Sequence, residues 1–290
     1  MNSKNTVSMY LLAILTFMST FCLSDNIATI FSHGIAATRT QVNGYVKSYK
    51  KHDITHYNDR YVIYTPYVTF NYPDATNKFY RVNYNETSFG QENEISRLNK
   101  AYEATLAHYD DCNIILYGLS RGASNVLIFA GLYQPHSIKA LVIESPYFTM
   151  GQVISNIMIK NNLGWLPLSY GETIAEFIFK KYTRYGHSPA NCIKNISKDI
   201  PIFIICSKQD HLVPYESSVD VYKELVKSGH EHTYIFITDQ GKHAAILQGS
   251  DGEQYQYVIN AFYKKYNLPY CANNAKKGES LLALCQPKLN

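Results

Sequence analysis

The chain has few charged residues: they occupy 17% of its 290 positions, and the formal net charge is only +4. The lysines and arginines form no stripe with interleaved aromatic residues, so the sequence lacks the pattern of a nucleic-acid-binding protein. Glycine and proline are also few, with 15 and 10 residues, which excludes a collagen-like chain. Hydrophobic residues make up 46% of the sequence, and this content excludes disorder as the main state. A chain of this length can therefore build one sizeable hydrophobic core.

The cysteines show neither a Cys-x-x-Cys motif nor a Cys/His pair with zinc-ligand spacing, so no metal is expected. Of the six cysteines, Cys22 lies in an apolar N-terminal segment and five follow it. Cys271 and Cys285 bracket most of a polar tail, residues 269–290, which cannot build a core of its own. A disulfide between these two cysteines would stabilise the tail, and we expect that pairing. The odd count leaves at least one thiol free.

The first 24 residues follow the pattern of a secretory signal peptide. Lys4 supplies a positive charge, residues 7–23 are mostly apolar, and Cys22 and Ser24 are small residues suited to a cleavage site after Ser24. The sequence favours a signal peptide removed from a secreted or extracytoplasmic protein. A second interpretation is an uncleaved anchor through residues 7–23 that associates the protein with a membrane, although this run falls short of the roughly 20 residues of a comfortable span. A buried helix is the least favoured of the three.

Short β-rich runs alternate with helical stretches in the rest of the chain, as in an α/β fold whose sheet carries helices on both faces. We expect residues 25–290 to form a single domain with six strands, mostly or all parallel. The expected strands cover residues 26–31, 66–72 (with an alternative start at 61), 113–117, 138–143, 201–206 and 232–237. Apolar residues at helical spacing predict helices over residues 92–109, 123–133, 217–227 and 253–266.

Residues 151–185 interrupt this alternation. They hold the only tryptophan, two short helical segments and no strand, at a place where a crossover between parallel strands needs only about a dozen residues. We interpret the region, about residues 148–190, as a helical lid. Several of its side chains hint at an apolar substrate, although a lid must also bury an apolar underside: Ile157, Trp165, Leu166, Leu168 and Ile174.

Residues 118–122 form a Gly-x-Ser-x-Gly motif. Alone, this pattern arises by chance in about one in ten chains of this length, given a glycine frequency of about 7%. Its position is more informative, because a buried strand ends at Tyr117 and a helix begins after Gly122. Such a sharp turn strains the serine backbone and exposes the hydroxyl at the carboxyl edge of the sheet. Ser120 is therefore the candidate nucleophile.

A serine hydroxyl needs a base to take its proton, and the base needs an acid to orient it. Asp210 follows the strand at residues 201–206, and His243 follows the strand at residues 232–237, so both come to the edge where the serine lies. We predict Asp210 as the acid and His243 as the base. Glu144 is a competing acid; its other interpretation is structural, as an acceptor for loop N–H groups.

The oxyanion of an acyl-transfer reaction needs two N–H donors. The first is the backbone N–H of Arg121, directly after the serine. The second should come from the loop after the first strand, where His33-Gly34 precedes Ile35, with Ala36 as the alternative donor. For the side chain of Arg121 two interpretations stay open: a contact to substrate, or a position on the protein surface.

Residues 26–267 resemble the α/β-hydrolase superfamily. Residues 140–148 (ALVIESPYF), Asp210–Pro214 and Gly241–His243 are similar to its prolyl-oligopeptidase-like and acyl-protein-thioesterase-like serine hydrolases. The resemblance implies an esterase, thioesterase, lipase or peptidase and does not choose among them. The family usually has two strands before the His-Gly strand, and there is no room for them here, so we expect a trimmed sheet. The tail after Leu268 has no counterpart in the family pattern.

Together these residues predict a serine hydrolase that cleaves an ester, thioester or amide bond of a small acyl-bearing substrate through an acyl-enzyme, without a cofactor. Esterase, thioesterase or lipase activity is favoured over peptidase activity. The alternative is a non-catalytic α/β-hydrolase-fold protein that binds a partner at the cell surface. Such proteins commonly lose a member of the triad, whereas all three candidates are present here.

Overall fold

The computed structural model describes residues 27–35, 37–46, 55–57, 60–62, 67–75, 83–109 and 112–286. The predicted signal peptide or anchor lies outside these residues. Within them, no helix has both the length and the apolar character needed to cross a membrane.

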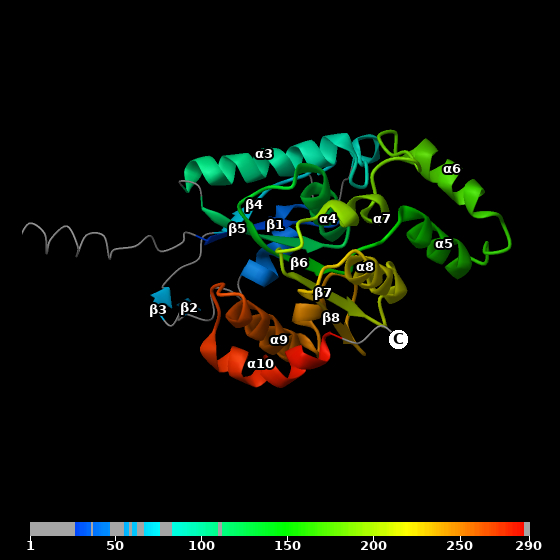
Figure 1. Ribbon diagram of the computed structural model, residues 1–290. Coiled ribbons are helices and arrows are strands. Elements are labelled where there is room, and N and C mark those ends of the chain that lie inside the picture. The colour runs from blue at the N-terminus through cyan, green and yellow to red at the C-terminus, as the bar shows by residue number, and fades with distance from the viewer. Residues whose placement is uncertain are drawn as a thin grey trace, which may run out of the picture.

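A six-stranded sheet forms the centre of the protein (Figure 1), in the order β4-β1-β5-β6-β7-β8. Every neighbouring pair in it runs parallel. The strands are β1 (Ile27–Ser32), β4 (Tyr67–Thr69), β5 (Asn113–Leu119), β6 (Ile138–Glu144), β7 (Ile202–Ser207) and β8 (Thr233–Thr238). The prediction of six parallel strands is confirmed. The alternative start of the second strand at residue 61 is wrong, because β3 (Arg60–Val62) pairs with β2 (Thr55–Tyr57) in a separate antiparallel sheet.

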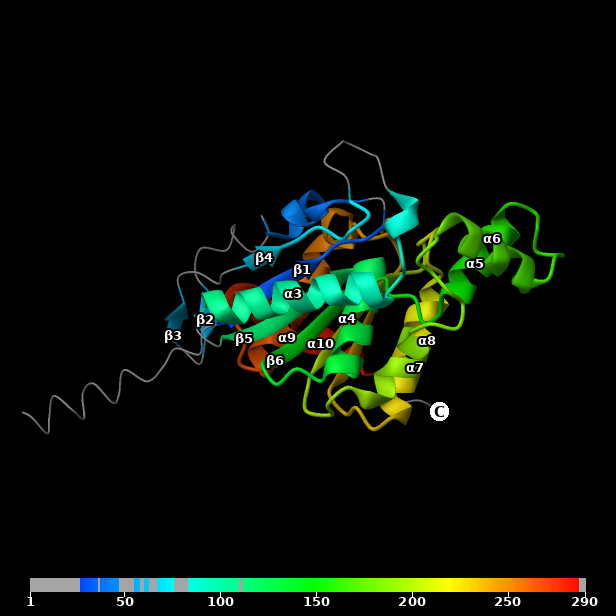
Figure 2. The same ribbon diagram turned by 90° about the horizontal axis from the view of Figure 1, so that it is seen from above.

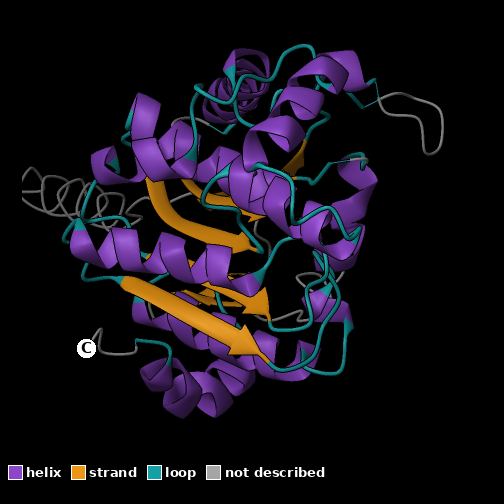
Figure 3. Ribbon diagram, turned by 90° about the vertical axis from the view of Figure 1, so that its right-hand side faces the viewer, coloured by secondary structure: helices purple, strands orange, loops and turns teal. Residues whose placement is uncertain are grey.

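Helices cover both faces of the sheet (Figure 3). Successive side chains of a strand point to opposite faces, so Ile114 and Leu116 of β5 enter one hydrophobic cluster while Ile115 and Tyr117 enter the other. The first cluster packs against α3 (Glu92–His108), α4 (Arg121–Tyr133) and α8 (Tyr215–Lys227); the second packs against α9 (Gly252–Lys265) and α10 (Ala272–Leu284). The four predicted helices are confirmed within two residues at each end. The shorter elements are α7 (Pro189–Cys192), η1 (Arg39–Val42), η2 (Tyr84–Glu86), η3 (Ile193–Asn195) and η4 (Ile246–Gln248).

The C-terminal tail corrects a prediction. Cys271 and Cys285 are both free thiols, so the expected disulfide is wrong. They flank α10, whose 13 residues span about 20 Å at 1.5 Å per residue, whereas bridged cysteines lie about 5.5 Å apart at Cα. The tail is held by packing instead: Ala275 and Leu282 are buried against the second cluster.

Gly278 marks the closest approach of α10 to α9. A Cβ at this position would lie 1.9 Å from the carbonyl oxygen of Tyr257, so the two helix backbones leave no room for a side chain. We expect Gly278→Ala to lower the free energy of unfolding by about 1–3 kcal/mol, since overpacking exceeds the gain in helix propensity. Chemical denaturation would measure the change, with the exposed Ser280→Ala on the same helix as control. Equal stability of both variants would contradict this packing.

Two helices, α5 (Met150–Lys160) and α6 (Leu168–Ile178), follow β6 and project from the end of the molecule beyond the carboxyl ends of the strands (Figure 2). They lie where the lid was predicted, and we call them the lid helices. Thr149 and Gln152 form a capping box that fixes the start of α5. Apolar side chains from both helices pack with loop residues in a third hydrophobic cluster.

Candidate active site

Ser120 lies in the sharp turn between β5 and α4. Its backbone has φ 55° and ψ −121°, a left-handed conformation that costs a non-glycine residue about 1–3 kcal/mol. The flanking glycines allow the turn: a Cβ at Gly118 would lie 2.5 Å from the Cα of Ala123, and one at Gly122 would lie 2.2 Å from the carbonyl oxygen of Ser32. The N–H of Ser120 donates to the carbonyl of Glu144 at 2.8 Å. The strained geometry is thus held by tight packing and by the neighbouring strand.

The structure brings the three predicted residues together. The Nε2 atom of His243 lies 2.7 Å from Oγ of Ser120, and its Nδ1 atom lies 2.6 Å from Oδ2 of Asp210. With Nδ1–H donating to the carboxylate, Nε2 presents its lone pair to the serine hydroxyl. The three side chains come from loops after β5, β7 and β8 at one edge of the sheet.

Asp210 is fixed as an ionised group. Its Oδ1 atom accepts hydrogen bonds from the backbone N–H groups of Leu212 and Val213, at 2.9 and 3.0 Å. Burial raises the pKa of a carboxyl group, but the hydrogen bond and charge of His243, with the Leu212 amide, hold the pKa of Asp210 below its ordinary value. The carboxylate is therefore charged at neutral pH and can orient the histidine.

The Glu144 carboxylate hydrogen-bonds to Tyr45 and to the loop at Ile246, and among the described hydrogen bonds it has none to His243. It is fully buried and accepts hydrogen bonds from the Tyr45 hydroxyl and from the N–H of Ile246, at 2.9 and 3.0 Å to Oε1. The second bond ties down the loop that carries His243. Burial raises the pKa of Glu144 from 4.5 to about 7, despite these hydrogen bonds.

The raised pKa of Glu144 predicts a pH dependence of stability. A carboxyl group that binds its proton more tightly when folded stabilises the fold below its unfolded pKa, and this contribution is lost as pH rises through the folded pKa. Between pH 4.5 and 7 the loss amounts to about 3 kcal/mol. We expect Glu144→Gln to be less sensitive to pH than wild type over this window, as urea denaturation at several pH values would measure. Parallel curves for the two proteins would rule the effect out.

The two predicted oxyanion donors border the same pocket as Ser120. Arg121 is the first residue of α4, where a backbone N–H has no acceptor within the helix. Ile35 follows Gly34, whose carbonyl accepts hydrogen bonds from Nδ1 of His33 at 2.8 Å and from Nη2 of Arg121 at 3.1 Å. Because the peptide is trans, these bonds also fix the direction of the Ile35 N–H, opposite to the carbonyl. The alternative donor, Ala36, lies outside the described residues.

His33 is held as a neutral ring. Burial, followed by the charge of Arg121, lowers the pKa of His33 to about 4. Its Nδ1–H can then donate to Gly34, while Nε2 accepts from the N–H of Tyr72 at 3.2 Å. The His-Gly pair of the sequence therefore orients the peptide that precedes Ile35.

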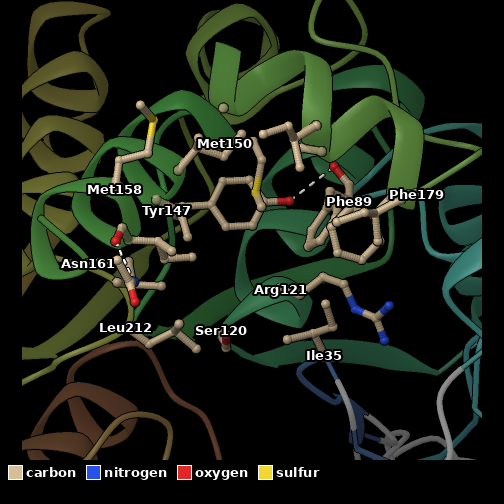
Figure 4. Close-up of a pocket in the computed structure, with 18 of the residues that line it drawn as sticks. Ile35, Phe89, Ser120, Arg121, Tyr147, Met150, Met158, Asn161, Phe179 and Leu212 are labelled. Carbon is tan, nitrogen blue, oxygen red and sulfur yellow. Dashed lines mark hydrogen bonds between the residues drawn. The ribbon is translucent and has the colours of Figure 1, made fainter. Parts of the chain in front are cut away.

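The side chain of Arg121 corrects a prediction, because it is 1% exposed and does not lie on the surface. Its guanidinium pairs with Asp74 at 2.5 and 3.1 Å and with Glu94 at 2.9 Å, and it lies over the ring of Tyr72. In Figure 4 the guanidinium points away from the pocket, so a direct contact to substrate is not supported either. The sequence analysis did not single out Glu94. This carboxylate directly precedes Ile95 of the apolar stripe of α3, and that position could have indicated a buried ion pair.

A pocket of about 450 Å³ lies above Ser120 and beneath the lid helices (Figure 4). Ile157 and Ile174 line it as members of the lid. The other lining residues are mostly apolar, and sequence reasoning missed those that come from irregular loops: Phe89, Tyr147, Phe179, Leu212 and Val213. The hydroxyl of Tyr147 donates to the carbonyl of Phe89 and so turns away from the serine. Trp165 is 78% exposed and lies outside the pocket, against the hint drawn from sequence.

Comparison with known families decides the relationship. Residues 75–268, more than half of the chain, match the model of the prolyl oligopeptidase family. The chain belongs to this family. Its resemblance to the α/β-hydrolases and its predicted fold class are confirmed.

Solved structures similar to this prolyl oligopeptidase family member share its α/β-hydrolase fold. The esterase Pf2001 of Pyrococcus furiosus matches with a TM-score of 0.59 and 16% identity, over 83% of this chain and 82% of that one. The acylaminoacyl peptidase of Pyrococcus horikoshii matches with a TM-score of 0.57 and 16% identity, over 86% of this chain and 38% of that one. At such low identity these likenesses show the fold alone.

The matches to curated relatives cover only part of this chain and part of each relative. The uncharacterised protein R595 of Acanthamoeba polyphaga mimivirus is 27% identical over 144 residues, which are 47% of this chain and 44% of that protein. The uncharacterised protein YfhR of Escherichia coli O157:H7 is 26% identical over 164 residues, 55% of this chain and 50% of that protein. The chain spans about half the length of the curated relatives it matches.

Proposed function

We propose that the protein is a serine hydrolase that cleaves esters or thioesters with an apolar acyl group. The observation that carries this proposal is the convergence of Ser120, His243 and Asp210 at the floor of an apolar pocket. Membership of the prolyl oligopeptidase family supports the reaction class. The site needs no cofactor for this chemistry.

In the proposed reaction, Oγ of Ser120 attacks the acyl carbonyl while Nε2 of His243 takes the hydroxyl proton. Asp210 stabilises the imidazolium that forms. The backbone N–H groups of Ile35 and Arg121 bind the oxyanion; loss of one such donor typically costs about 2.7–4 kcal/mol in barrier. His243 then gives its proton to the leaving alcohol or thiol, and water cleaves the acyl-enzyme by the same steps.

The lining of the pocket favours an acyl chain over a peptide. Of the described residues that line it, none is Asp, Glu or Lys, and the one cation, Arg121, is occupied by Asp74 and Glu94. A peptidase that recognises a free amino terminus or a charged side chain would need an opposite charge in its pocket, because a buried unpaired charge is costly. The volume of about 450 Å³ is within the range of small-molecule sites.

Acyl chain length tests the proposal. With p-nitrophenyl esters of increasing length, we expect kcat/KM to rise about fourfold per added methylene until the pocket is full, because each buried CH₂ contributes about 0.8 kcal/mol. Aminoacyl anilides should be turned over far more slowly. Ala175→Phe, which fills the pocket from α6, should shorten the best chain and leave acetate ester turnover as the internal control. A flat length profile, or faster cleavage of the anilides, would contradict the proposed substrate class.

A further inference from the structure

The lid helices and the loops next to them hold most of the exposed large apolar side chains of the described residues. Of fourteen large apolar side chains that are exposed there, ten lie between residues 157 and 185. Trp165 and Phe177 are 78% and 74% exposed. Soluble monomers rarely leave so many neighbouring apolar side chains in water, and such a patch marks an interaction surface.

The two sides of α6 explain how this surface arises. Gly171 and Ala175 face α5: a Cβ at Gly171 would lie 2.5 Å from the sulfur of Met158, and Ala175 is buried. Tyr170, Ile174 and Phe177 recur at intervals of four and three residues, so they share another side of the helix. All three are exposed. We call this stripe, together with Trp165 in the preceding loop, the lid face.

The charge around the lid face is positive. Between residues 150 and 185 the acidic residues are Glu172 and Glu176, and both pair with Arg184, at 3.5 and 2.7 Å. The remaining charges there are lysines, two of which, Lys180 and Lys181, follow Phe177 by three and four residues. The Nζ atom of Lys180 lies 4.0 Å from the ring centroid of Phe177, so a cation borders the apolar stripe itself.

From this pattern we propose that the lid face binds the surface of an anionic lipid bilayer. Exposed aromatic and aliphatic side chains bordered by lysines are the combination that inserts into the headgroup region, where apolar burial and attraction to anionic lipids act together. A second copy of the chain fits less well, because a two-fold symmetric pairing uses the same patch of both copies and would bring two positively charged faces together. Bilayer binding does not require the proposed hydrolase activity.

The pocket opens next to the lid face, so a bilayer bound there could supply the substrate. Only this link between bilayer binding and substrate rests on the proposed function. Ile157, Ile174 and Ile178 line the pocket and are also exposed on the lid helices. The rim of the pocket is therefore continuous with the lid face. An acyl chain leaving a bilayer could pass along this rim without crossing water.

The chain supplies its own reporter, because Trp165 is its only tryptophan. With the full chain carrying Ser120→Ala, which separates binding from turnover, we expect a blue shift of Trp165 emission on adding phosphatidylcholine vesicles that contain phosphatidylserine. Brominated acyl chains should quench the emission, and added salt should reverse both effects. Vesicles of phosphatidylcholine alone should cause a much smaller shift. Since the signal reports on the lid only, attachment through the N-terminal segment cannot imitate it.

Variants locate the contact. Phe177→Ser should weaken the apparent vesicle affinity about tenfold, and Lys180→Gln with Lys181→Gln about fivefold for each lysine. The controls are Leu284→Ser, which removes a side chain that is 77% exposed on α10, and Lys100→Gln with Lys227→Gln; both should bind like the parent.

Two results would overturn the proposal. One is Trp165 emission that stays unchanged with anionic vesicles at low salt. The other is a blue shift that follows protein concentration without lipid and coincides with dimer formation in light scattering, which would make the lid face an interface between copies. Ester turnover by the wild-type chain, which keeps Ser120, is measured separately, so failure of bilayer binding and failure of the proposed reaction are distinguishable.

Discussion

Ser120→Ala is expected to abolish ester turnover and labelling by a fluorophosphonate probe. Among the described hydrogen bonds, Oγ of Ser120 is the only partner of Nε2 of His243, at 2.7 Å. The variant removes this oxygen, so the histidine has no hydroxyl to activate. By analogy with triads in general, kcat should fall about 10⁵- to 10⁶-fold. Mass spectrometry of the labelled wild type should place the probe on the peptide that contains Ser120. The exposed Ser197→Ala serves as matched control and should label and turn over normally.

The same measurement separates the two candidate acids. Asp210→Asn should lower kcat about 10⁴-fold, because an amide cannot hold the Nδ1–H tautomer of His243. Glu144→Gln should keep most of the activity, since Glu144 bonds Tyr45 and Ile246 and not the histidine. If turnover survives in Ser120→Ala, or if Glu144→Gln loses as much as Asp210→Asn, the proposed triad is wrong.

The strands and the convergence of the site were predictable for a common reason. A parallel strand buried on both faces is a continuous apolar run, as in residues 113–117, and such runs stand out in a single sequence. Once the strands are parallel, the residues that follow them meet at one edge. Ser120, Asp210 and His243 could therefore be placed together from their order along the chain.

The surroundings of Arg121 were not predictable, because one of its partners comes from an irregular loop. Asp74 lies in a segment without helical or strand periodicity, and Glu94 lies in the first turn of α3. The helix was predicted, but nothing in its periodicity indicates that Glu94 pairs with Arg121. The disulfide prediction failed for a different reason: the sequence of the tail was read as polar, although Ala275 and Leu282 at helical spacing bury against α9. The orientation of Trp165 was not predictable either, since an apolar residue in a lid can face either the pocket or water.

Among side chains that do not contact the reacting atoms, we expect the removal of the Arg121 side chain to lower the free energy of unfolding most. Arg121→Met keeps much of the side-chain volume but leaves the carboxylates of Asp74 and Glu94 buried at 1% exposure or less without their cation. Breaking a buried ion pair by removing one partner typically costs about 3–5 kcal/mol. Chemical denaturation should show this loss, and the variant should recover most of the lost stability when Asp74→Asn and Glu94→Gln are added.

Arg121→Lys separates stability from positioning, and it keeps the test open if Arg121→Met does not fold. A lysine preserves the charge but offers no planar fork, so it cannot pair with Asp74 and also donate to the Gly34 carbonyl as the guanidinium does. The Gly34–Ile35 peptide then loses one of its two restraints, and the Ile35 N–H is less well aimed. We expect kcat to fall about 10-fold or more while KM changes little, since the oxyanion exists only beyond the ground state.

A transition-state analogue distinguishes a positioning role of Arg121 from a simple loss of stability. An alkyl boronic acid, whose boron accepts Oγ of Ser120 and becomes a tetrahedral, oxyanion-like boronate, should bind Arg121→Lys more weakly by the same factor as the fall in kcat. Glu94→Gln is the matched control: it weakens the same buried ion pair without touching the carbonyl of Gly34, so its stability should fall while kcat and analogue affinity are largely kept. Equal losses of kcat in both variants would show that Arg121 acts only through the stability of the fold, because the control leaves the Gly34 contact in place.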